Sequence, residues 1–197
     1  MDFGNTPELL ARYVNGDAQA LDQLLERIRP RIVLWAAGRM SGALRQRHDA
    51  EDVAQETLAH VHRDIASFGG ADLGRFLSWV YAIGLNVIRG LADREGAQKR
   101  QLPRPKPFSQ TSPSESARRQ ERRKAVTQAL ARLSDAEREA IVLRHIEERP
   151  VAELAELWGT TPGAVRVRVF RAKQALKRAL PPGHASSTEP AASVPSA

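Results

Sequence analysis

The chain has 197 residues, of which 42% are hydrophobic and 27% charged, a balance typical of globular proteins rather than of disordered ones. This length suits one domain or two small ones. The chain has no cysteine, which excludes disulfides, thiolate zinc sites and a cysteine nucleophile. The first residues lack the basic and apolar regions of a secretion signal, and no apolar run approaches the ~18 residues of a membrane span. We therefore expect a cytoplasmic protein without membrane insertion.

Charge is distributed unevenly along the chain. Residues 1–96 contain 11 Lys and Arg against 13 Asp and Glu, a net charge of −2, whereas residues 97–197 contain 19 against 10, a net charge of +9. A basic half of this kind most often binds a polyanion such as nucleic acid, and the acidic half needs a different partner. The alternative is a generally basic protein with no such partner.

The spacing of apolar residues predicts an all-α fold, because no stretch shows the period-2 alternation of a strand. In the first half we expect helices over residues 9–16, 21–40, 49–66 and 73–94. Pro30 lies inside the second of these and predicts a kink or a break. Residues 41–48 read as a polar connection, and Gly69-Gly70 ends the third helix.

Composition divides the chain into two small helical domains, one over residues 1–98 and one over residues 113–180. Between them, residues 99–112 are rich in proline and basic residues and predict a flexible linker. The residues from 181 to 197 lack periodicity and predict a disordered tail. Capping boxes at Ser112–Glu115 and Ser134–Glu137 mark two helix starts in the second domain.

The end of the second domain predicts a helix-turn-helix. An amphipathic segment over residues 151–158 is followed by Gly159, which suits a left-handed helix end, and by Thr161-Pro162, which suits a helix start. The second helix, residues 162–180, has one apolar stripe and six cations on its other faces. This combination favours a DNA recognition helix over a surface helix, a calmodulin-like target or a membrane-surface element.

The position of each polar side chain on this recognition helix predicts its role. Residues near its start are expected to approach base edges, and later cations are expected to clamp phosphates. The expected base-side residues are Thr161, Gly163, Ala164 and Arg166, and the expected phosphate clamps are Arg168, Arg171 and Lys173. Phe170 lies off the apolar stripe, where it contacts either a thymine methyl group or a neighbouring helix.

Two pairs of segments together resemble one family. Residues 129–144 (ALARLSDAEREAIVLR) and 151–173 (VAELAELWGTTPGAVRVRVFRAK) resemble region 4 of the extracytoplasmic function (ECF) sigma factors, in the sigma-70 superfamily of bacterial RNA polymerase sigma factors. Residues 49–58 (DAEDVAQETL) and 76–86 (FLSWVYAIGLN) resemble region 2 of the same family. The resemblance covers roughly residues 9–180, in the order that the family shows.

The resemblance implies a sigma factor that directs core RNA polymerase to a specific promoter set. The second domain would read the upstream (minus-35) element, and the first would open the minus-10 element. The family implies promoter DNA as a partner, adds an anti-sigma factor as a further candidate partner, and implies no enzymatic activity, no cofactor and no metal.

The resemblance also assigns site residues in the first domain. Those implied to dock on the clamp helices of the largest polymerase subunit are Asp49, Glu51, Asp52, Gln55 and Glu56. Those expected to be exposed for contact with the minus-10 region are Phe68, Tyr81, Asn86 and Arg89, whereas Phe76, Trp79, Ile83 and Val87 read as core. The sequence departs from the family at Leu58, which alters the core slightly and leaves the docking face unchanged. It also departs at Gly84, Gly90 and Asp93, which weakens the expectation of promoter opening.

Three other functions stay open from the sequence. One is a free-standing helix-turn-helix regulator whose first domain senses a ligand or dimerises. Another is a metal-dependent enzyme that uses the row His48, Asp52, Glu56 and His60, although no nucleophile or phosphate loop accompanies the row. The third is a degenerate relative that binds polymerase without opening promoters.

Overall fold

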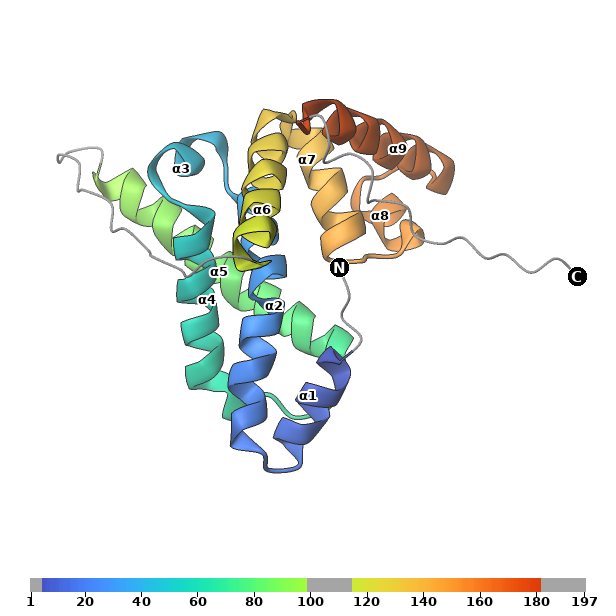
Figure 1. Ribbon diagram of the computed structural model, residues 1–197. Coiled ribbons are helices and arrows are strands. Elements are labelled where there is room, and N and C mark those ends of the chain that lie inside the picture. The colour runs from blue at the N-terminus through green and yellow to red at the C-terminus, as the bar shows by residue number, and fades with distance from the viewer. Residues whose placement is uncertain (1–4, 99–114, 182–197) are drawn as a thin grey trace, which may run out of the picture.

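The computed structural model describes residues 5–98 and 115–181. Within these residues every regular element is a helix, which confirms the all-α prediction (Figure 1). The predicted linker over residues 99–112 and the tail beyond residue 181 lie outside the described residues, as does the capping box at Ser112. The elements are α1 (Thr6–Val14), α2 (Ala18–Arg39), α3 (Gly42–Arg47), α4 (Ala50–Asp64), a 3-10 helix η1 (Ile65–Ser67), α5 (Leu73–Gln98), α6 (Glu115–Arg132), α7 (Asp135–Ile141), a π-helix η2 (Val142–Ile146), α8 (Val151–Leu157) and α9 (Pro162–Ala179).

Helix α2 is the centre of the N-terminal bundle, where it packs against α1, α4 and α5. Asp17 starts it, because the carboxylate accepts hydrogen bonds from the backbone amides of Gln19 at 3.1 Å and Ala20 at 3.3 Å. Arg12 of α1 pairs with the same carboxylate at 2.6 Å. The fully buried ring of Trp35 lies near the other end of α2. The N-terminal core therefore depends on a single long helix.

The structure differs from the expectations for this region at two points. Of the kink or break expected at Pro30, the break is absent, since α2 continues as one helix from Ala18 to Arg39. Proline removes one backbone hydrogen bond there, but α2 buries residues on both sides of Pro30, and this packing holds the helix together. The polar stretch from residue 41 to residue 48 contains the short helix α3, which Ser41 caps and which buries Leu44.

Helices α4 and α5 complete the N-terminal bundle. Asp49 caps α4 by accepting a hydrogen bond from the amide of Glu51 at 3.0 Å. At the start of α5, Phe68 lies edge-on to Phe76, with ring centroids 5.4 Å apart, and 5.3 Å from Trp79. This aromatic cluster fixes the loop between η1 and α5 against the core.

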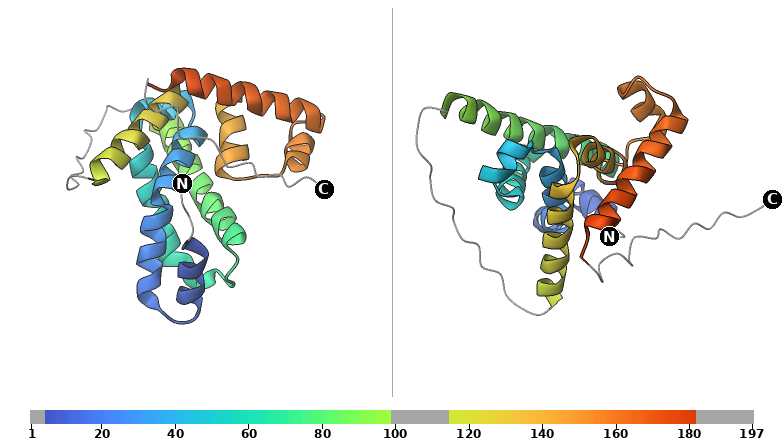
Figure 2. Two further views of the ribbon diagram at one scale, coloured as in Figure 1. Left: turned by 45° about the vertical axis from the view of Figure 1, so that its right-hand side comes forward. Right: turned by 90° about the horizontal axis from the view of Figure 1, so that it is seen from above.

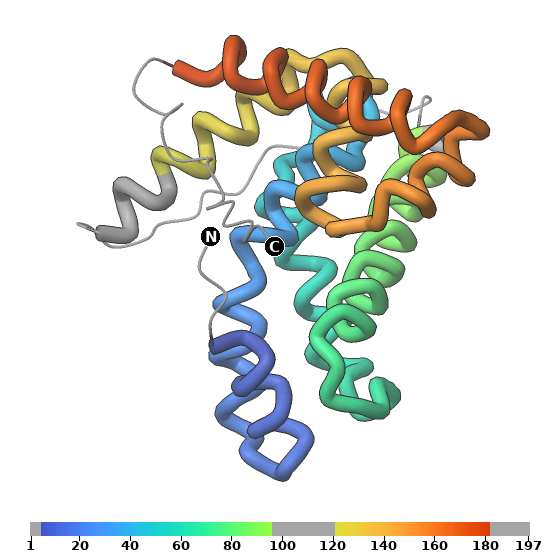
Figure 3. Tube along the Cα trace, turned by 90° about the vertical axis from the view of Figure 1, so that its right-hand side faces the viewer, coloured from blue at the N-terminus to red at the C-terminus, as the bar shows by residue number. Residues whose placement is uncertain are grey.

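The C-terminal helices form a smaller unit in which α9 covers α7 and α8 (Figures 2 and 3). Ser134 begins α7 with the predicted capping box: its hydroxyl accepts from the amide of Glu137, whose carboxylate accepts from the amide of Ser134 at 3.0 Å. Arg138 is buried behind this turn and donates to the carbonyls of Leu130 and Leu133.

The two units are in contact along α2, which packs against α6, α7 and η2. Leu34 of α2 belongs to the core of the C-terminal unit, and Val142 of η2 belongs to the core of the N-terminal one. The sequence predicted two small domains but not this contact between them.

Candidate nucleic-acid and polymerase interfaces

The predicted helix-turn-helix is present as α8 and α9. Gly159 has a φ of +59°, the left-handed conformation that ends α8, and the amide of Thr160 donates to the carbonyl of Ala155 at 2.9 Å. Thr161 caps α9, since its hydroxyl accepts from the amide of Ala164 at 3.2 Å, and Pro162 occupies the first helical position. The turn therefore has the geometry that its residue types predict.

Helix α9 buries one side and exposes the other. Val165 and Ala172 are fully buried against the C-terminal core. The expected base-side residues Thr161, Gly163, Ala164 and Arg166 are all exposed, and so is Arg171. Phe170 is 61% exposed, so its alternative role of packing on a neighbouring helix is wrong. The exposed side of α9 carries cations and two large apolar side chains, Val167 and Phe170.

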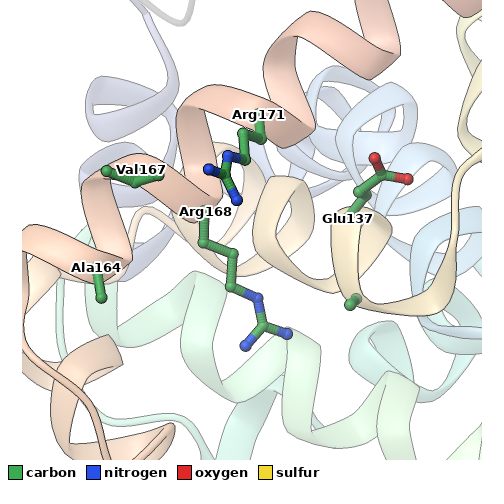
Figure 4. A pocket seen from close by; sticks show the side chains of 6 residues that line it. Glu137, Ala164, Val167, Arg168 and Arg171 are labelled. Atoms are coloured by element: carbon green, nitrogen blue, oxygen red, sulfur yellow. The ribbon is translucent and has the colours of Figure 1, made fainter.

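A groove lies between α7 and α9 (Figure 4). Its lining residues are Ala136, Glu137, Ala164, Val167, Arg168 and Arg171. The guanidinium carbon of Arg168 is 4.0 Å from the centroid of the Trp158 ring, and its Nη2 atom is 3.2 Å from Glu139. Arg168 and Lys173 are half-buried, unlike Arg171. Arg168 is therefore held in place by its own domain.

The five residues implied to dock on polymerase lie along α4 and its cap. Asp49, Asp52 and Gln55 are exposed. Glu51 is 3.7 Å from Arg29 of α2 and 3.7 Å from Arg123 of α6, whereas Glu56 is 3.6 Å from Arg94 of α5. We call Asp49, Glu51, Asp52, Gln55 and Glu56 the acidic face. The structure brings them together, and it also places a cation of the C-terminal unit beside them.

Three of the four residues expected to contact the minus-10 region reach the surface of the N-terminal unit. Asn86 and Arg89 are exposed, and Arg89 Nη1 lies 3.5 Å from Asn86 Oδ1 on the same side of α5. Phe68 is half-buried in the aromatic cluster. The fourth residue, Tyr81, is only 6% exposed, so the expectation that it is exposed was wrong.

Tyr81 is buried because the apolar face of α5 is wider than the sequence predicted, and it includes residues beside the expected core positions. Its ring stacks on Trp35, with centroids 5.3 Å apart, and its hydroxyl accepts from Arg31 Nε at 2.6 Å. The hydroxyl donates to the carbonyl of Ile146 at 3.0 Å. Burial raises the pKa of Tyr81 to about 12, against the opposing effect of Arg31. A second apolar row through Leu77 and Ile88 was the sequence signal for this placement.

The four residues considered for a metal-dependent enzyme, His48, Asp52, Glu56 and His60, do not form one site. Three of them contact different partners. His48 precedes α4 and lies 3.0 Å from Glu95 of α5, Glu56 pairs with Arg94, and His60 Nδ1 is 2.7 Å from Arg63. Among the residues that the structure describes, no group of three or more His, Cys, Asp or Glu side chains is placed to hold a metal ion.

In residues 5–98 and 115–181, no helix has both the length and the apolar character needed to cross a bilayer.

Sequence reasoning missed the charged groups between the two units. Arg31 is buried, and Glu147, whose side chain is 5% exposed, accepts a hydrogen bond from Trp35 Nε1 at 2.9 Å. These partners are more than 100 residues apart, and neither lies in a local motif. The sequence signal was Arg31, which directly precedes the apolar run of residues 32–37 in α2.

Comparison with known proteins identifies both halves. Residues 24–96 match the family described as Sigma-70 region 2, and residues 123–176 match Sigma-70, region 4. The ECF RNA polymerase sigma factor SigD of Mycobacterium tuberculosis is 32% identical, over 86% of this chain and 81% of the relative. ShbA, an ECF RNA polymerase sigma factor of Streptomyces griseus, is 30% identical, over 86% and 92%. The RNA polymerase sigma-H factor of Pseudomonas aeruginosa is 27% identical, over 89% and 93%.

Both regions occur in the family's order, and the most similar relatives are covered over most of their length. The helix-turn-helix and the acidic face lie in the matched segments. The chain therefore belongs to the ECF sigma factors of bacterial RNA polymerase, within the sigma-70 family.

Proposed function

We propose a division of labour between the two halves of this sigma factor. The domain over residues 1–98 docks on core RNA polymerase and opens the minus-10 element. The domain over residues 113–180 reads the minus-35 element of promoter DNA, and residues 99–112 join the two. The observation that carries this proposal is the pairing of an acidic face on α4 with an exposed basic recognition helix, α9, in one chain.

For polymerase docking, the acidic face is the proposed contact with the clamp helices of the largest subunit. Asp52 and Gln55 are exposed on α4, and the side chain of Glu56 is partly exposed beside Arg94. Exposed charges at the edge of an interface speed the encounter and fix the orientation of the partners. Asp49 has a second role, because its carboxylate also caps α4.

For promoter recognition, the start of α9 is the proposed base reader. Thr161, Gly163 and Ala164 let the backbone approach the groove closely, and Arg166 is long enough to reach a base edge. Arg168, Arg171 and Lys173 are the proposed phosphate contacts. In the N-terminal domain Asn86 and Arg89 are proposed to contact the minus-10 region, together with Phe68 once an unstacked base displaces its neighbours. Tyr81 takes this role only after the units separate.

The protein is proposed to act by binding alone, in the cytoplasm, with no catalytic residues of its own. Its proposed partners are core polymerase, promoter DNA and, in line with a solved complex, an anti-sigma factor. That complex contains the sigma factor RpoE and the anti-sigma factor NepR from Bartonella quintana; this sigma factor is 23% identical to the chain, with a TM-score of 0.44 over 82% of this chain and 94% of the other.

The test is binding of the full chain to core polymerase without DNA, with and without reversed charge on the acidic face. Asp52→Lys combined with Glu56→Lys should weaken binding at least about tenfold, or ~1.4 kcal/mol. The matched control, Glu8→Lys combined with Asp93→Lys, makes the same change in net charge at exposed positions on α1 and α5. Equal weakening by both pairs would reject the acidic face. Failure of the unmodified chain to bind polymerase while it binds DNA would favour a free-standing regulator.

A further inference from the structure

The strongest feature that the proposed function leaves unused is the contact between α2 and η2. The carbonyl of Ile146, at the end of η2, accepts hydrogen bonds from both Arg31 and Tyr81 of the N-terminal unit. Glu148 follows with a φ of 59°, which is rare for a residue other than glycine, and its carboxylate lies 3.4 Å from Arg31 Nη2. Arg31 thus stabilises the backbone just after η2, where Glu148 has a left-handed conformation that residues other than glycine adopt rarely.

A buried ion pair completes this contact. The carboxylate of Glu147 lies 3.1 Å from Arg39 and 2.9 Å from Arg149, and it accepts the hydrogen bond from Trp35. A carboxylate with a side chain only 5% exposed is costly unless charged or polar partners surround it. Here the partners come from both units, so separation of the units exposes the whole group to water at once.

Gly38 lets the helices approach this closely. A Cβ atom at this position would lie 2.1 Å from Val142 Cγ2, 3.5 Å from Val142 Cβ and 3.8 Å from Arg138 Cγ. All three atoms belong to the C-terminal unit. The contact with η2 therefore requires glycine at this position, because a larger side chain would overlap with Val142.

The closed contact covers groups that the proposed function requires to be accessible. Tyr81 is buried beneath the Ile146 carbonyl, and Arg123 of α6 lies 3.7 Å from Glu51 of the acidic face. Helix α6 packs alongside α2, next to α4 in the view of Figure 1. A polymerase that binds the acidic face therefore meets a cation of the protein's own C-terminal domain there.

We propose that the contact of η2 and α6 with α2 is an autoinhibitory clamp, in which the C-terminal domain holds the free sigma factor closed until core polymerase displaces it. This inference rests on the proposed role of the acidic face. When only the open fraction binds, the apparent dissociation constant rises in inverse proportion to that fraction. An open state populated at 10% or less lowers the apparent affinity at least about tenfold.

A designed disulfide tests the clamp directly, since the chain has no native cysteine. The Cβ atoms at positions 38 and 142 would be 3.5 Å apart, at the short end of the range that a disulfide spans. In the full chain, Gly38→Cys with Val142→Cys should form an intrachain disulfide under mild oxidation. The oxidised protein should bind core polymerase at least about tenfold more weakly than the same protein after reduction, and each single-cysteine variant should show no redox effect.

A substitution that separates the two units tests the proposal from the opposite direction. Gly38→Leu places a side chain where Val142 lies, so it should increase the radius of gyration in solution and tighten polymerase binding. Gly42→Leu is the matched control, because a Cβ there meets only Arg45 Nη2, at 3.8 Å. This control should leave both quantities unchanged.

Four results would overturn the clamp, and they separate its failure from that of the proposed function. Thiols that stay unpaired under oxidation show that the closed contact is not populated. A disulfide that forms without weakening polymerase binding shows that the contact is not inhibitory. A Gly38→Leu variant that expands yet binds no tighter leads to the same conclusion. Failure of the unmodified and reduced proteins to bind polymerase overturns the proposed function and the clamp with it.

Discussion

The guanidinium group of Arg168 lies over the indole ring of Trp158, with Cζ 4.0 Å from the ring centroid. Arg168 belongs to α9 and Trp158 to the turn after α8, so the contact joins the two helices of the DNA-binding motif. Glu139 of α7 holds the same guanidinium at 3.2 Å. Arg168, which the sequence predicts to contact a DNA phosphate, therefore also helps to orient α9 on the other helices of its domain.

This double role makes a prediction about stability. Arg168→Ala should lower the free energy of unfolding by ~1 kcal/mol, because it removes the cation–π contact and the partly exposed ion pair with Glu139. Arg166→Ala, at an exposed position, should change stability by less than ~0.5 kcal/mol. Thermal or denaturant unfolding of the full chain measures both. Equal stability of the two variants would show that the contacts of Arg168 with Trp158 and Glu139 do not stabilise the fold.

Base reading and phosphate clamping on α9 predict different changes in promoter choice. Arg166→Ala should change the preferred upstream sequence, since an Arg contact to guanine contributes ~1 to 3 kcal/mol of discrimination. Arg171→Ala and Lys173→Ala should weaken all sequences alike and reduce the salt dependence by about one unit of slope each. Selection by holoenzyme from a randomised upstream element gives the measurement. A preference altered by Lys173→Ala but unchanged by Arg166→Ala would mean that α9 lies in the groove in another register.

Tyr81 predicts a loss of stability at high pH. Burial raises the pKa of Tyr81 from its ordinary 10.0 to about 12 in the folded protein; Arg31 lowers this pKa, whereas Glu147 and Glu148 raise it further. A raised pKa means that the protonated phenol stabilises the fold fully below pH 10, and that this contribution, on the order of 2 kcal/mol, is lost as the pH rises through about 12.

The comparison that isolates this effect is with Tyr81→Phe, which removes the titrating group and keeps the ring. The difference in unfolding free energy between wild type and Tyr81→Phe should shrink as the pH rises from neutral through about 12. A difference that stays constant over this range would show that Tyr81 titrates normally and that its burial is incomplete in solution.

Local signals in the sequence were sufficient to predict the elements that carry the candidate site. The capping box at Ser134 and the sequence from Gly159 to Pro162 have the predicted geometry, and α4 begins at Ala50, one residue after the predicted start of that helix. Each depends on side chains within a few residues of the backbone groups that they satisfy. The spacing of chemical types alone therefore located α4, α7 and the turn before α9.

Contacts between distant segments were beyond such reasoning. The burial of Tyr81 depends on Ile146, 65 residues away, and Trp35 meets Glu147 across 112 residues. The continuity of α2 through Pro30 likewise depends on tertiary packing that outweighs the local preference for a break. No periodicity within one segment encodes which face of another segment will cover it.

The structure predicts opposite consequences for the substitution of two glycines of α5, Gly84 and Gly90. A Cβ at Gly84 would lie 2.5 Å from Trp35 Cζ3 and 3.3 Å from Thr57 Cγ2, whereas a Cβ at Gly90 meets only Arg94 Nη2, at 3.8 Å. Gly84→Ala should therefore destabilise the fold by ~1 to 3 kcal/mol through overpacking. Gly90→Ala should stabilise it by roughly 0.5 to 1 kcal/mol, because alanine favours a helix interior. Denaturant unfolding of both variants measures the contrast, and a Gly84→Ala variant as stable as wild type would mean that the Trp35 ring has room to shift.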